Sequence, residues 1–122
     1  MRYWLRRQLP GFVPSQGRWR HMADLYDGDE VVVLDCETSV FDKHKGELLS
    51  VAAVVVKGQE ILLSQALELT ICSDAKTDRN AVRVHYLTKE DRSAGVSVAE
   101  AIEKLLDFIG NRPICGFYIE YD

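Results

Sequence analysis

The sequence has little cysteine, little proline and no long apolar segment. Among 122 residues there are three Cys and three Pro, and no apolar run approaches the roughly 20 residues that span a bilayer. The N-terminus lacks the apolar core of a secretory signal, so we expect no membrane association. Cys36, Cys72 and Cys115 lie far apart and lack the paired spacing of a zinc site. We therefore expect buried, reduced thiols in a cytoplasmic protein.

Acidic residues are missing from the first 20 positions, although the net charge of the chain is −4. That stretch holds five basic residues: Arg2, Arg6, Arg7, Arg18 and Arg20. We interpret residues 1–26 as a basic arm, with a short helix within 18–26. Contact with nucleic-acid phosphate and a solvated tail fit this charge equally well. An organellar transit peptide has a similar start, but Pro10, Pro14 and Gly17 break any long amphipathic helix.

The rest of the chain, residues 27–122, is predicted to be one domain. The chain is 47% hydrophobic and 28% charged, which is typical of a soluble globular protein. Apolar, β-branched runs at 31–36, 47–56 and 60–71 predict three strands, the last two joined by the turn at 57–59. A helix and a short strand at 114–117 follow. The order β-β-β-α-β indicates an α/β fold with a mixed sheet.

The helix is the clearest single element. Ser97 can cap its N-terminus, and Glu100 three residues later completes a capping-box pattern. Gly110 and Pro113 supply the stop. We expect one apolar face made of Val98, Ile102, Leu105, Leu106 and Ile109.

Two carboxylates stand at the end of the first predicted strand. Asp35 and Glu37 are separated by one residue, so they project from the same face of the strand. Ligands bind at the carboxyl ends of strands in open α/β sheets. A divalent cation such as Mg²⁺ or Mn²⁺ relieves the repulsion between two such groups. The alternative is that the strand ends at Cys36 and both acids are solvated.

The two ends of the predicted domain together resemble the DEDD-type 3′–5′ exonucleases, such as the epsilon-like proofreading subunits of bacterial DNA polymerases. The first motif of that family is an apolar strand ending Asp-x-Glu-Thr, matched by Asp35, Glu37 and Thr38. Its second motif is matched in part by residues 114–122, where Phe117-Tyr118 and Tyr121-Asp122 replace His-Asn and Phe-Asp. Residues 47–54 and 84–88 resemble the segments between these motifs.

The resemblance implies a ribonuclease H-like fold and a two-metal hydrolysis of phosphodiesters to nucleoside 5′-monophosphates. It implies that Asp35, Glu37 and Asp122 bind Mg²⁺ or Mn²⁺ as catalytic residues. Thr38 and His85 would contact the substrate, a single-stranded DNA or RNA 3′ end. A DNA polymerase is the partner that the resemblance suggests.

The family also has a third motif, with a general base and a fourth metal-binding Asp, which the sequence does not contain. We therefore expect a truncated domain that lacks the C-terminal part of the fold, binds metal weakly, hydrolyses little and self-associates. Two other functions fit the residues: a non-catalytic nucleic-acid-binding or interaction module, and an RNA-trimming exonuclease of the same fold. For Trp4 and Trp19 we favour packing on the domain over base stacking, and for residues 43–45 a solvated loop.

Overall fold

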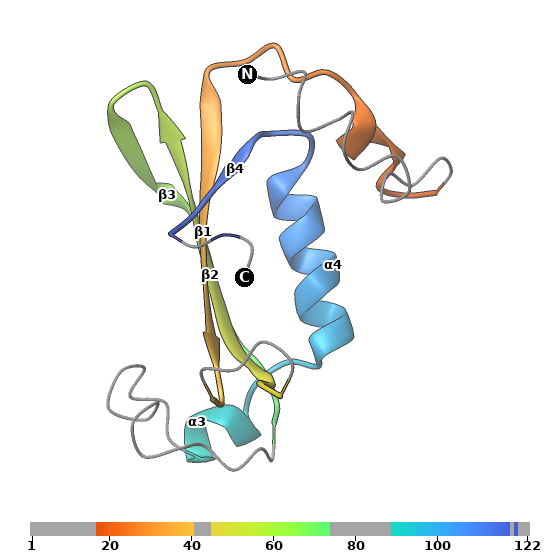
Figure 1. Cartoon of the computed structure of the whole chain (residues 1–122), viewed down its shortest axis with the longest axis vertical. Coiled ribbons are helices and arrows are strands. Elements are labelled where there is room, and N and C mark those ends of the chain that lie inside the picture. The colour runs from red at the N-terminus through yellow and green to blue at the C-terminus, as the bar shows by residue number, and fades with distance from the viewer. Residues whose placement is uncertain (1–16, 41–44, 74–88, 118, 120–122) are drawn as a thin grey trace.

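The computed structural model describes residues 17–40, 45–73, 89–117 and 119. Four strands form one sheet in the order β3-β2-β1-β4, with bounds β1 Glu30–Thr38, β2 Leu48–Lys57, β3 Glu60–Thr70 and β4 Ile114–Cys115 (Figure 1). The first three strands are antiparallel neighbours, and β4 runs parallel to β1. The predicted α/β fold, with a hairpin sheet and a helical crossover to a last strand, is confirmed.

Three helical segments accompany the sheet: the 3-10 turn η1 (Arg20–Ala23), α3 (Lys89–Ser93) and α4 (Val98–Ile109). α4 runs along one side of the sheet, and α3 lies beyond the end at which β1 finishes (Figure 1). α3 has no counterpart among the predicted elements, because five residues are too few to show a periodic apolar pattern. Among the described helices, none has the length and apolar character needed to cross a membrane.

The core lies between α4 and one face of the sheet. Alternate residues of the two central strands point into it, since side chains alternate along a strand. Its buried cluster consists of Val32, Leu34, Val51, Ala53 and Ile109. Full burial of a Val or Leu side chain contributes about 1.5–3 kcal/mol, so this row fixes which face of β1 points inward.

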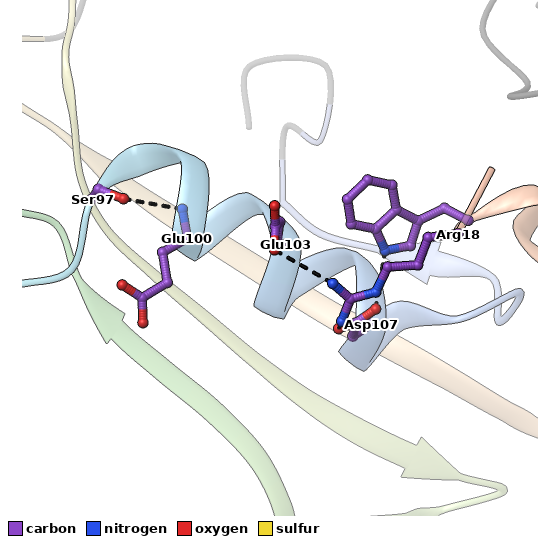
Figure 2. Close-up of polar contacts among 6 residues, drawn as sticks. Arg18, Ser97, Glu100, Glu103 and Asp107 are labelled. Carbon is purple, nitrogen blue, oxygen red and sulfur yellow. Dashed lines mark hydrogen bonds and ion pairs between the residues drawn. The ribbon is translucent and has the colours of Figure 1, made fainter.

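Ser97 caps α4 as predicted, because its side chain accepts a hydrogen bond from the Glu100 backbone N–H at 3.2 Å (Figure 2). The Glu100 carboxylate points away from the cap and lies 2.8 Å from Lys104 Nζ, one helical turn on. The C-terminal stop is also as predicted, with Gly110 at a φ of 59°.

The predicted apolar face of α4 is partly wrong. Ala101 and Ile109 are buried, and Leu105 and Phe108 pack against the core cluster. Val98 and Ile102 each remain 46% exposed. Ala101, at 1% exposure, lets the helix backbone approach the sheet closely. The buried face of α4 is therefore rotated about the helix axis relative to the predicted face. Val98 and Ile102 lie at the edge of the core.

The basic segment before β1 is fixed to α4 by polar contacts. Arg18 forms ion pairs with Glu103, at 3.4 Å, and with Asp107 (Figure 2). Trp19 Nε1 donates a hydrogen bond to Asp107 Oδ1 at 3.0 Å, and Met22 packs against the core cluster. Trp19 thus packs on the domain, as favoured above, whereas Trp4 lies outside the described residues.

The expectation of three buried thiols is wrong for two of them. All three cysteines are free. Cys36 is half-buried and contacts the core cluster, but Cys72 and Cys115 are exposed. Cys72 lies two residues after the end of β3, and Cys115 lies on a two-residue strand at the edge of the sheet. A strand-like sequence pattern does not reveal whether a position is covered, and both of these side chains are exposed.

Candidate metal-binding site

Asp35 and Glu37 lie on the face of the sheet that points away from α4. Val32 and Leu34 occupy the inward-facing positions of β1, and the ladder with β2 is regular from Glu30 to Glu37. The two carboxylates therefore share the outward face, with backbones about 6.6 Å apart given the rise of a strand. The predicted common orientation of the pair is what the structure shows.

Small side chains flank the two carboxylates. Asp35 pairs with Ala52 of β2, and Glu37 pairs with Ser50. Ala52 pairs in turn with Glu68 of β3, so Glu68 shares the row of Asp35, about 10 Å away at two strand spacings. Asp35, Ala52 and Glu68 are all exposed. On the β2 side, the side chains directly beside the two acids are therefore small.

The regular pairing of β1 with β2 is interrupted immediately after Glu37. The register with β2 shifts between Glu37 and Thr38, so that an extra residue of β2 is accommodated there. Thr38 Oγ1 donates a hydrogen bond to the Val40 carbonyl oxygen at 2.9 Å. A hydroxyl that bonds the backbone two residues on is typical of a chain leaving its strand. Thr38, the predicted substrate contact, thus holds the turn that follows the carboxylates.

Ser39 links the end of β1 to the residue that precedes β2. It is only 3% exposed. Its backbone N–H donates to the Glu47 carbonyl oxygen at 2.9 Å, and its hydroxyl accepts from the Glu47 N–H at 3.0 Å. The side chain thus fills the acceptor role that a backbone carbonyl has in a regular ladder. Ser39 and Glu47 are therefore held together just beyond the end of β1 that carries the two carboxylates.

The contacts continue from Glu47 to the segment after β3 and to α3. Ser73 Oγ donates to Glu47 Oε2 at 3.0 Å, and the buried Arg92 donates from Nη1 to the Ser73 carbonyl oxygen at 3.4 Å. Gly95 lies nearby with its backbone directly against residues 70–72. α3 is thereby fixed at the end of the sheet that carries the carboxylates (Figure 1). In the sequence, the adjacent hydroxyl residues Thr38 and Ser39 are the local sign of this strand end, and the family motif includes Thr38 alone.

The donor set fits a hard divalent cation. An exposed carboxylate, Asp35, and a half-buried one, Glu37, on one face supply the oxygen ligands that Mg²⁺ and Mn²⁺ prefer. Within residues 17–40, 45–73, 89–117 and 119, no three His, Cys, Asp or Glu side chains come together as a metal site. The predicted third ligand, Asp122, and the predicted substrate contact, His85, lie outside the described residues, as do Lys43 and His44. Lys45 is exposed.

The sheet order, the helical crossover and the outward-facing acids together define a ribonuclease H-like nuclease fold. The family model described as RNase T, exonuclease, matches residues 32–120. This stretch is most of the chain and includes both Asp35 and Glu37. The chain belongs to this family of DEDD-type exonucleases, whose members use divalent metals.

Solved structures show the same fold at low sequence identity. An exonuclease I structure with an inhibitor superposes with a TM-score of 0.65 at 13% identity, over 76% of this chain and 22% of that one. Escherichia coli exonuclease I with a dT13 oligonucleotide superposes with a TM-score of 0.61 at 13% identity, over 74% of this chain and 20% of that one. Cell-death related nuclease 4 superposes with a TM-score of 0.58 at 15% identity, over 67% of this chain and 30% of that one. The chain thus spans less than a third of each. No curated protein matches the sequence.

Proposed function

We propose that this chain is the metal-binding part of a 3′–5′ exonuclease domain that hydrolyses single-stranded nucleic acid to nucleoside 5′-monophosphates. The observation that carries the proposal is the pairing of Asp35 and Glu37 on the outward face of a central strand, beside small side chains. Family membership supports the reaction class. The oligonucleotide complex of E. coli exonuclease I supports a single-stranded substrate.

Each residue has a defined task in this proposal. Asp35 and Glu37 are the ligands from β1, and Asp122 is the third ligand that the sequence motif suggests. Two divalent cations, when bound, activate a water and stabilise the leaving oxygen. Thr38 holds the backbone after β1 in its turn, which places that backbone next to the terminal nucleotide. The small side chains of Ser50 and Ala52 leave space for the phosphate to approach the acids.

The isolated 122-residue chain is proposed to bind metal weakly and to hydrolyse little. The described residues bring two carboxylates to the site, and the chain spans less than a third of the solved exonucleases it resembles. A two-metal site needs further ligands and a group that accepts the proton of the attacking water. An association with a DNA polymerase stays a prediction from the resemblance alone.

Thermal unfolding with and without Mn²⁺ tests the proposal. A ligand that binds only the folded state at ten times its Kd stabilises that state by about 1.4 kcal/mol, which raises the Tm of a domain this size by several degrees. We expect this rise in the wild type and its loss in Asp35→Asn. Glu68→Gln, a carboxylate on the same row, is the matched control and should keep it. An equal rise in wild type and Asp35→Asn contradicts the proposal.

A further inference from the structure

The end of β1 is held by a buried hydroxyl that the proposed chemistry does not itself use. Ser39 lies two residues after Glu37 and is 3% exposed. Both of its hydrogen bonds described above go to one residue, Glu47, and they bracket the loop between the two positions. A buried hydroxyl that accepts a hydrogen bond at a strand end limits how far the preceding residues can shift. The nearest proposed metal ligand along the chain is Glu37.

The Ser39 contact lies beside an irregularity in the strand register. Between Glu37 and Thr38 the ladder slips by one residue of β2, and pairing resumes with Thr38 opposite Leu48. The hydrogen bonds between Ser39 and Glu47 continue this pairing on the far side of the slip, two residues after Glu37. Glu37 is therefore held between regular pairing with Ser50 on one side and the Ser39 contact on the other.

We propose that Ser39 is a positioning residue for the metal site, acting through Glu47 to hold the carboxylates of β1 in the orientation that binds a divalent cation. The inference rests on the proposed function, because it presumes that Asp35 and Glu37 are ligands. Groups that orient metal ligands without touching the ion typically change affinity by 10–100-fold when removed. Ser39 contacts the backbone near the ligands, so we expect a change of roughly tenfold, at the lower end of that range.

The contact from Ser73 to Glu47 extends the restraint to the segment after β3. Ser73 Oγ donates to the Glu47 carboxylate, and Arg92 of α3 donates to the Ser73 carbonyl. Loss of the Glu47 side chain would free the start of β2 from this segment while leaving Ser39 intact. Glu47→Ala therefore tests whether this extension to Ser73 contributes, since the bonds to Ser39 come from the Glu47 backbone, and Glu47→Gln keeps an oxygen that can accept from Ser73.

The experiment measures the Kd for Mn²⁺ by electron paramagnetic resonance on the 122-residue chain, with the metal-free Tm recorded in parallel. Ser39→Ala should raise the Kd roughly tenfold, while Ser39→Thr, which keeps the hydroxyl, should stay near the wild type. Glu47→Ala should raise the Kd more than Glu47→Gln. A lower Tm with an unchanged Kd in Ser39→Ala would show a purely structural role and overturn the inference.

The outcomes separate this inference from the proposed function. Failure of the wild type to bind Mn²⁺, or unchanged binding in Asp35→Asn, overturns both together. Wild-type binding that depends on Asp35 but not on Ser39 overturns the inference alone. If Ser39→Ala does not fold, Ser39→Cys decides, because its thiol is a weaker acceptor for the Glu47 N–H: a Kd equal to that of the wild type overturns the inference.

Discussion

Asp35 and Ala52 lie directly opposite each other on β1 and β2, on the face of the sheet that α4 leaves uncovered. Directly opposed residues in an antiparallel pair have Cβ atoms about 5 Å apart. The methyl group of Ala52 is therefore the nearest cross-strand neighbour of the carboxylate. Its small size keeps the space beside Asp35 open.

Ala52→Leu should obstruct that space and weaken Mn²⁺ binding without unfolding the chain. Ala52 is exposed, so the larger side chain meets solvent and not the packed core. The metal-induced rise in Tm should fall to half or less, while the metal-free Tm should change little. Ala66→Leu is the matched control, because Ala66 is an exposed alanine on the same face, opposite Val54. An equal loss in both variants contradicts the steric argument.

Hydrolysis by the 122-residue chain should be slow. The described residues place two carboxylates at the site and group no third His, Cys, Asp or Glu with them; with these two alone, proton transfer and charge stabilisation are incomplete. Incubation with a 3′-labelled single-stranded oligonucleotide and Mn²⁺ should release little mononucleotide over hours. Asp35→Asn provides the background rate. Rapid release that Asp35→Asn abolishes would show that this chain carries a complete site.

The exposed apolar residues of the sheet should make the chain self-associate. Ile61 is 62% exposed and Leu63 is 80% exposed on the edge strand β3, and Phe117 is 94% exposed after β4. Exposed apolar groups on an uncovered sheet favour association. Light scattering should report a dimer or larger species. Leu63→Lys should shift the distribution toward monomer, whereas Leu25→Lys, at 62% exposure in the segment before β1, should not.

Gly95→Ala should destabilise the junction between α3 and α4. A Cβ at this position would lie 2.6 Å from Ile71 C and from Thr70 O, and neither backbone atom can move without shifting β3. The expected loss of unfolding free energy is about 1–3 kcal/mol in a urea titration. Gly58→Asn is the control, since this turn has open space around it and a φ of 60° that Asn tolerates. Similar midpoints for both variants would contradict the close approach.

Much of this fold could be predicted from local sequence patterns. The branched apolar run of β1 and the Ser97 cap of α4 each indicate one structure by themselves, and both lie where expected. The register could not be predicted, because Leu48 and Leu49 are both apolar and an alternating pattern can begin at either. The structure buries Leu49 and pairs Leu48 with Thr38 across a shift.

One part of the candidate site could likewise be predicted from the sequence, and another part could not. The shared face of Asp35 and Glu37 follows from the two-residue period of a strand alone. The role of Ser39 depends on a contact with Glu47 eight positions away, across an irregular register that no local pattern encodes. Asp122 and His85, assigned from the resemblance, stay predictions. So does the cytoplasmic location inferred from the cysteines.

The hydrogen bond from Trp19 to Asp107 gives the protein an internal fluorescent reporter. The sequence holds two tryptophans, so replacing Trp4 by Phe leaves a single indole whose emission reflects the carboxylate of α4. Detachment of the segment before β1 would then be seen as a spectral change at constant helix content. The order in which that segment and the sheet come apart could be followed in one unfolding experiment.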